Sequence, residues 1–147
     1  MSDTIKFRKL KNGARIDMPV HKGDCGYDVY ATKRIELTPQ SHKKVGLGFA
    51  LEFDDSLVCM VQAKSGLAAK HGLTTIGNVV DSSYRGEIHA ILHNASDEFI
   101  VLNQGDKIAQ LIFLRCETPK IIKSSKLSNT SRNSKGFGST DIVNRKI

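Results

Sequence analysis

Short apolar segments separated by polar turns recur along most of the chain. Residues 5–10 alternate apolar and basic positions, the pattern of a strand with one exposed face. Further strands are predicted at 27–31, 34–37, 44–51, 57–63, 99–102 and 107–114. Only residues 65–71 have a helical pattern, with Ser65 as the expected N-cap. Many short strands and one short helix predict an all-β fold, either a sandwich or a barrel.

Residues 77–92 carry the most distinctive pattern. An apolar run reaches Asp81, a polar turn follows, and Gly86 precedes a second apolar run at 88–92. We interpret the two runs as antiparallel strands joined by a tight connection. The connection would place the carboxylate of Asp81, the hydroxyl of Tyr84 and the guanidinium of Arg85 at one end of a hairpin. A solvated turn has the same composition, so this pattern alone leaves both interpretations open.

The chain is predicted to form one domain with a C-terminal extension. Its 147 residues are enough for a single core. Residues 1–117 carry the strand pattern, whereas residues 118–147 are too polar to build a core. Within that extension Phe137 stands alone between two glycines. We therefore expect a β-barrel domain, 1–117, and a mobile arm, 118–147, which either closes over a ligand or remains a disordered tail.

Composition and charge limit the location and the partners. No run approaches the ~20 apolar residues that cross a bilayer, and the polar N-terminus lacks the apolar segment of a secretion signal. The three cysteines are widely spaced, which favours reduced thiols over disulfides or a zinc site. We predict an intracellular protein, cytoplasmic or nuclear, without a membrane partner. The net charge of +7 favours anionic partners, but the charge is scattered and no Trp is present, so nucleic acid is not the expected partner.

Five stretches, in order along the chain, resemble the motifs of one enzyme family. They are C-G-Y-D-V at 25–29, A-K-S-G-L at 63–67, G-N-V-V-D-S-S-Y-R-G-E at 77–87, G-D-K-I-A-Q-L at 105–111 and R-N-S-K-G-F-G-S-T at 132–140. Together they resemble the motifs of the trimeric dUTP pyrophosphatases (dUTPases). The resemblance implies a jelly-roll-like β-barrel, the dUTPase β-clip, in a homotrimer whose active sites bridge subunits.

The resemblance also implies a reaction. The enzyme would hydrolyse dUTP to dUMP and diphosphate by attack of water on the α-phosphorus, with Mg²⁺ as cofactor. Such an enzyme limits uracil incorporation into DNA and supplies dUMP for thymidylate synthesis.

Each site residue receives a role from the resemblance. Asp81 is the catalytic residue that orients the water, and Asp28 holds waters on the Mg²⁺ that the triphosphate chelates. Tyr84 packs under the deoxyribose, where its bulk excludes a ribose 2′-hydroxyl. The residues that meet phosphates are Lys64, Ser65, Gly66, Gln110, Arg132, Gly138, Ser139 and Thr140. The uracil is bound by main-chain groups of Asn78, Val79, Val80 and His89, and Phe137 stacks on it.

The chain departs from the family motifs at a few positions. Lys64 and Lys107 stand where the family has Arg, and Lys cannot make the planar two-pronged contact of Arg with phosphate. Ala63 replaces a Pro, and Asn133 and Asp141 replace glycines. These departures leave open a regulatory protein that binds dUTP without cleaving it. Two further hypotheses are a dCTP deaminase of the same fold and a nucleic-acid-binding protein.

Overall fold

The computed structural model describes residues 4–136, within which lie one short helix and twelve strands. In chain order they are β1 (Lys6–Lys9), β2 (Ile16–Asp17), β3 (Tyr27–Tyr30), β4 (Ile35–Leu37), β5 (Ser41–Gly46), β6 (Phe49–Glu52), β7 (Leu57–Gln62), α1 (Ser65–His71), β8 (Leu73–Ile76), β9 (Val79–Val80), β10 (His89–Asn94), β11 (Ile100–Leu102) and β12 (Lys107–Arg115). The predicted all-β fold with one short helix is confirmed. No helix in the described part of the chain has the length and apolar character to cross a bilayer.

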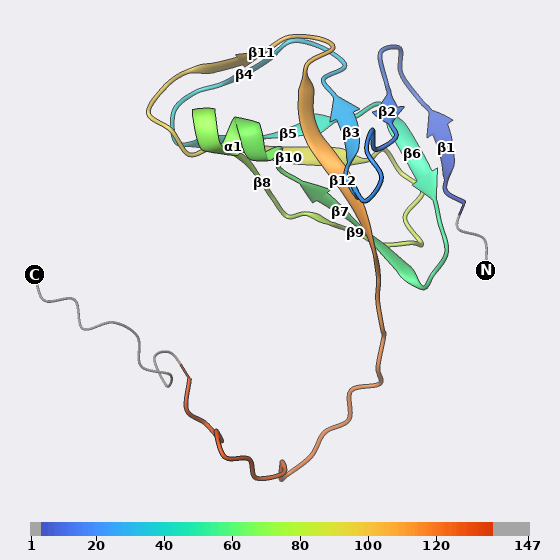
Figure 1. Cartoon of the computed structure of the whole chain (residues 1–147), viewed down its shortest axis with the longest axis vertical. Helices are drawn as coiled ribbons and strands as arrows, with labels where there is room; N and C mark the ends of the chain where they lie inside the picture. Colours follow the sequence, from blue (N-terminus) through green and yellow to red (C-terminus); the bar gives the residue numbers. More distant parts are fainter. Residues whose placement is uncertain (1–3, 137–147) are drawn as a thin grey trace, which may run out of the picture. The chain divides into compact units, whose positions relative to one another are not determined.

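The strands of the described residues form four antiparallel sheets, which do not close into a continuous barrel. Their strand orders are β2-β3-β12-β7-β9, β5-β10-β8, β1-β6 and β11-β4. Figure 1 shows β4 and β11 side by side at one end of this unit, with β1 and β6 at the other. This arrangement is a jelly-roll-like β-clip, as expected from the sequence.

One apolar core lies between the sheets. Alternation along the strands builds it: in β10, Ala90, Leu92 and Asn94 are buried, while His89, Ile91 and His93 on the other face are half-buried. The largest fully buried apolar side chains are Phe49, Leu37, Leu47, Leu73, Ile88, Leu92, Ile108 and Leu111. Cys59 is 0 % exposed in this core. Burial raises the pKa of its thiol to about 12, so Cys59 remains protonated and packs as a small apolar residue, as expected.

Most of the predicted strands have the predicted bounds. The strands expected at 5–10, 27–31, 34–37, 57–63, 99–102 and 107–114 each begin and end within one residue of the observed limits. The strand expected at 44–51 is instead two strands, β5 and β6. Gly48 separates them with a φ of 78°, a left-handed conformation that glycine adopts without strain.

The predicted hairpin at 77–92 is wrong in its pairing. Val79 and Val80 of β9 pair with β7, whereas β10 pairs with β5 and β8. The two apolar runs therefore belong to different sheets, and residues 81–88 form a loop between them, here called the Asp81 loop. Its tight turn is closed by the Tyr84 N–H, which donates to the Asp81 carbonyl at 3.1 Å.

The predicted cap of α1 is also corrected. The N-cap residue is Lys64, and no side chain accepts a hydrogen bond from the first turn. Ser65 is the first helical residue. The helix ends at Gly72, whose φ of 64° and hydrogen bonds to the carbonyls of Ala68 and Leu67 close its C-terminus.

The chain divides into two units after Glu117. In the second unit, residues 118–136 contain no helix or strand, and Ile121 and Leu127 are 94 % and 89 % exposed. A turn is closed by the Lys135 N–H, which donates to the Arg132 carbonyl at 3.0 Å. Asn133 in this turn has a φ of 45°, which Asn tolerates better than most residues. That this unit is a mobile arm stays a prediction.

Candidate functional site

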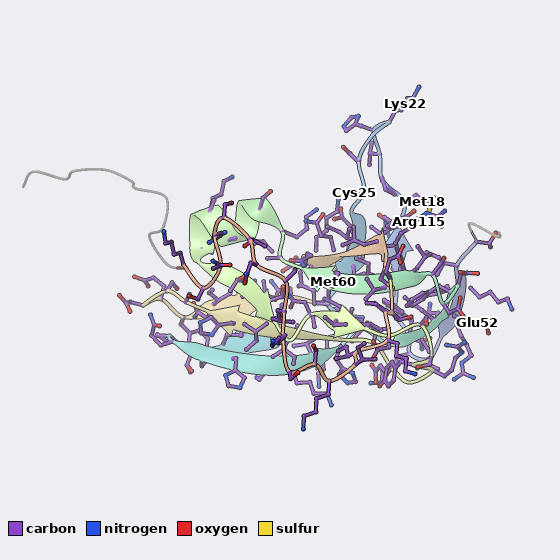
Figure 2. All side chains as sticks on the ribbon, turned by 90° about the horizontal axis from the view of Figure 1, so that it is seen from below. Met18, Lys22, Cys25, Glu52, Met60 and Arg115 are labelled. Carbon is purple, nitrogen blue, oxygen red and sulfur yellow. The ribbon has the colours of Figure 1, made fainter. Side chains whose placement is uncertain are left out.

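A recess of about 350 Å³ lies beside the central strands β3 and β12. Asp28 of β3 and Gln110 of β12 are partners in the ladder, and Gln110 also pairs with Gln62, the last residue of β7. Because Lys64 follows Gln62 by two residues, the strand register brings Asp28, Lys64 and Gln110 to one place. The loop 18–25 forms another wall, and Figure 2 shows this loop, with Met18, Lys22 and Cys25, projecting from the sheets.

The carboxylate of Asp28, which lines this recess, binds two lysines. Lys64 donates to Oδ1, and Lys107 Nζ lies 2.9 Å from Oδ2. Burial alone raises the pKa of Asp28, but the hydrogen bonds from Lys64 and Lys107 outweigh burial and hold the pKa below its ordinary value. The hydrogen bond from Lys107 to Asp28 raises the pKa of Lys107 above its ordinary value. Lys64 and Lys107 therefore share one carboxylate, and a phosphate oxygen that enters here can replace that carboxylate as their partner.

Gln110 is held in one orientation by its surroundings. Its Nε2 donates to the Ala63 carbonyl at 2.9 Å. A Cβ atom at Gly26 would lie 2.0 Å from Gln110 Oε1, so only glycine at position 26 leaves room for this side chain. Ser65 and Gly66, at the start of α1, are exposed and follow Lys64 directly.

We expect Gly26→Ala to displace the Gln110 side chain and to break its bond to Ala63. Because the clash is with the flexible end of a side chain, the free energy of unfolding should change by no more than about 1 kcal/mol. Enzymatic turnover should fall to the level of Gln110→Ala, because both changes remove the Gln110 side chain from its place in the recess. Steady-state kinetics and urea unfolding of both variants measure this, and wild-type turnover in Gly26→Ala would contradict it.

A second recess, of about 290 Å³, contains the Asp81 loop. Its lining includes five predicted site residues, Val79, Val80, Asp81, Tyr84 and His89. The Tyr84 ring folds back over its own loop, and its hydroxyl donates to the Glu87 carbonyl at 3.2 Å. A Cβ atom at Gly86 would lie 2.4 Å from that hydroxyl, so the ring position requires glycine there.

Asn78, which directly precedes β9, has an unusual side chain. Its main-chain carbonyl accepts from the Val61 N–H at 2.9 Å. Its side-chain Oδ1 is buried, and among residues 4–136 it is the one buried side-chain oxygen or nitrogen without a hydrogen-bond partner. An unpaired buried acceptor is costly, so this oxygen is a local source of strain beside the Asp81 loop.

Within one chain the predicted site residues form separate groups. No residue lines both the recess of Asp28, Lys64 and Gln110 and the recess of Asp81 and Tyr84. Arg132 lies in the second unit, where its Nε donates to the Lys135 carbonyl at 2.9 Å. Phe137, Gly138, Ser139 and Thr140 lie outside the described residues, as does Asp141.

Lys107 and Glu87, which have no assigned role among the predicted site residues, also contact or line the two recesses. Lys107 binds Asp28, and its motif position near Gln110 is a usable signal. Glu87 lines the recess of the Asp81 loop, and its only sequence signal is its place in the third motif.

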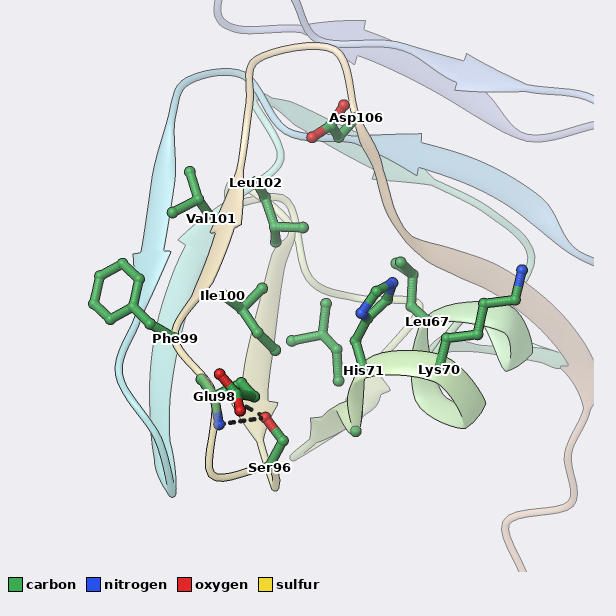
Figure 3. A pocket seen from close by; sticks show the side chains of 12 residues that line it. Leu67, Lys70, His71, Ser96, Glu98, Phe99, Ile100, Val101, Leu102 and Asp106 are labelled. Carbon is green, nitrogen blue, oxygen red and sulfur yellow. Dashed lines mark hydrogen bonds between the residues drawn. The ribbon is translucent and has the colours of Figure 1, made fainter.

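A larger cavity, about 540 Å³, contains none of the predicted site residues. Figure 3 shows it between α1 and β11, with Leu67, Ile100 and Leu102 at its apolar wall and Lys70 and His71 on the helix. Volume alone therefore does not identify the site. The recess of Asp28, Lys64 and Gln110 is the stronger candidate, because it gathers residues from three distant motifs, whereas the second recess is lined mainly by residues 77–91.

Solved structures of dUTPases have this fold. A Staphylococcus bacteriophage 80alpha dUTPase mutant with dUpNHpp superposes with a TM-score of 0.87 at 22 % identity, covering 96 % of this chain and 100 % of that one. A mutant dUTPase of phage phi11 of S. aureus, described with a structural Mg(II) ion, has a TM-score of 0.79 at 22 % identity and covers 86 % of this chain and 100 % of its own.

Sequence comparison identifies the family. The dUTPase family model matches residues 13–141. The deoxyuridine 5'-triphosphate nucleotidohydrolase of Paramecium bursaria Chlorella virus 1 is 33 % identical over 139 residues, which cover 95 % of this chain and 99 % of the relative. The chain belongs to the dUTPase family, which confirms the resemblance of its five motifs.

Proposed function

We propose that this protein is a dUTP diphosphatase, which hydrolyses dUTP to dUMP and diphosphate. The proposal rests on the meeting of Asp28, Lys64 and Gln110, from three motifs of the family, in one recess. Family membership makes this the activity to test first, since its relatives are named for it.

The triphosphate binds at the Asp28 recess. The phosphate oxygens there contact Lys64 and Gln110. They also contact the exposed start of α1, at Ser65 and Gly66. Residues 4–136 contain no cluster of three side chains that could hold a metal directly. One ionised carboxylate, that of Asp28, fits a Mg²⁺ that keeps its waters and is chelated mainly by the triphosphate. When bound, the ion neutralises charge on the phosphate oxygens.

The nucleoside binds at the Asp81 loop. Main-chain groups of Asn78, Val79 and Val80, with His89 opposite, bind uracil, and Tyr84 lies under the deoxyribose. Asp81 orients the water that attacks the α-phosphorus. Catalysis then consists of alignment and charge stabilisation without a covalent intermediate.

The complete site requires more than one subunit. In a single chain the phosphate recess and the Asp81 loop are lined by different residues, and Arg132 belongs to a separate unit. In a homotrimer, the Asp81 loop of one subunit meets the Asp28 recess of another. The arm, residues 118–147, closes this site with Arg132, Phe137, Gly138, Ser139 and Thr140. The protein acts inside the cell, in the cytoplasm or nucleus, where it limits uracil in DNA and supplies dUMP.

The test is diphosphate release with and without Mg²⁺ across dUTP, dTTP, dCTP and UTP, with the oligomer measured by light scattering. We expect Mg²⁺-dependent hydrolysis of dUTP alone, by a trimer. Ammonia release from dCTP would instead identify a deaminase. Tight dUTP binding without diphosphate release would identify a regulatory protein.

A further inference from the structure

Glu87 ties the Asp81 loop to two other parts of the fold. Its Oε1 accepts from the Gly48 N–H at 2.9 Å, and Lys11 Nζ lies 2.9 Å and 2.8 Å from Oε1 and Oε2. The Glu87 side chain is 19 % exposed and that of Lys11 is 56 % exposed, so the Gly48 bond is part-buried while the lysine end of the ion pair lies in solvent. The hydrogen bond from Lys11 and that from Gly48 outweigh burial and hold the pKa of Glu87 below its ordinary value, so the carboxylate is ionised at neutral pH.

The main chain leaves room for this carboxylate. A Cβ atom at Gly46 would lie 2.3 Å from Glu87 Oε1. Gly48, which donates to the same oxygen, has a φ of 78°. The carbonyl of Gly48 also accepts from the N–H groups of Leu10 and Lys11, at 2.8 Å and 3.0 Å. The segments that receive Glu87 are therefore fixed to each other independently of it.

The main-chain carbonyl of Glu87 holds the two aromatic side chains of the recess. It accepts from the Tyr84 hydroxyl at 3.2 Å and from His89 Nδ1 at 2.8 Å. Because a carbonyl only accepts, His89 carries its proton on Nδ1 in this arrangement. Tyr84 is 45 % exposed and has Gly86 beneath its ring, so few other contacts fix it.

We propose that Glu87 is a positioning residue that determines nucleoside specificity. Its carboxylate, held by Lys11 and Gly48, fixes the carbonyl that orients Tyr84 and His89, and so sets how strictly the site rejects a ribose. This inference rests on the proposed function, because it assigns Tyr84 to the sugar. Glu87 does not contact the reacting phosphorus, so its removal should act on binding and selectivity more than on turnover.

The test compares kcat and KM for dUTP and UTP in Glu87→Ala, Glu87→Gln and Lys11→Met. In Glu87→Ala, kcat/KM for dUTP divided by kcat/KM for UTP should fall about tenfold, which is the loss expected for a charge-assisted hydrogen bond. The change should lie mostly in the KM values and not in kcat. Glu87→Gln keeps an acceptor for Gly48 and, like Lys11→Met, should show a smaller fall. Glu36→Gln, which breaks the exposed ion pair with Arg34, is the matched control and should keep the wild-type ratio.

A second readout is the protonation of His89, measured by ¹⁵N NMR. The wild type should show the Nδ1–H tautomer, and Glu87→Ala should lose it. An unchanged dUTP-to-UTP ratio in Glu87→Ala would overturn the inference. If Glu87→Ala does not fold, an unchanged ratio in both Glu87→Gln and Lys11→Met would overturn it. If the wild type does not hydrolyse dUTP, the proposed function is wrong. The role of Glu87 can still be tested in that case, because an Nδ1–H tautomer that persists in Glu87→Ala would overturn it.

Discussion

Asp81→Asn should still bind dUTP but should lose turnover by a factor of roughly 10² to 10⁴, the contribution of a positioned acid–base group. Asn has the shape of Asp, so the main-chain turn from Tyr84 to the Asp81 carbonyl should survive. The substituted amide carries no charge with which to orient a water or to accept its proton. The loss should therefore be seen in kcat and not in KM.

Two measurements and one control decide this prediction. Diphosphate release gives kcat, and calorimetry with dUTP gives the affinity of the slowly turning variant. Asp55→Asn, an exposed carboxylate in the turn between β6 and β7, should leave both unchanged. A kcat near that of the wild type would remove Asp81 from the mechanism, and a loss of affinity without a loss of kcat would make it a binding residue.

The sequence is sufficient to predict where most strands lie, but not which strands pair with each other. Alternation in β10 predicts one buried face, and the structure has it. Nothing in that alternation distinguishes β9 from β8 or β5 as the neighbour, because alternation determines which face of a strand is buried and not which strand lies beside it. Strand pairing depends on contacts between distant segments, so the predicted hairpin is wrong although its strands exist.

The same limit applies to the site. Asp28, Lys64 and Gln110 are predicted from their motifs, but their meeting follows from the register of β3, β12 and β7, which the sequence does not state. The role of Glu87 is not visible in the sequence because its partners, Lys11 and Gly48, precede it by 76 and 39 positions. Lone charged residues in loops are usually solvated, and only the fold reveals that Gly46 leaves space for this carboxylate.

Lys64 and Lys107 determine how much positive charge the Asp28 recess offers to a phosphate. Both bind Asp28, so part of their charge is used within the protein. A phosphate that enters the recess competes with Asp28 for two point charges and meets no planar guanidinium fork there. Under the proposed function, their role is attraction and charge balance, and the alignment of the α-phosphorus is assigned to Gln110, Asp81 and the arm.

Deletion of residues 127–147 should leave a folded protein and should lower kcat/KM for dUTP by about 10²-fold or more, the scale of a lost positioning contact. The fold should persist because the described residues after Glu117 contain no helix or strand, and Ile121 and Ile122 are exposed. Activity should be lost because the deletion removes Arg132 and the motif at 136–140. Circular dichroism, thermal unfolding and light scattering should match the wild type, while diphosphate release falls.

A variant of full length with residues 127–131 replaced by Gly and Ser keeps the motif and should stay active, since a flexible linker of equal length has the same reach. Full activity in the truncated protein would show that the extension is only a tail, and that the site is complete without it.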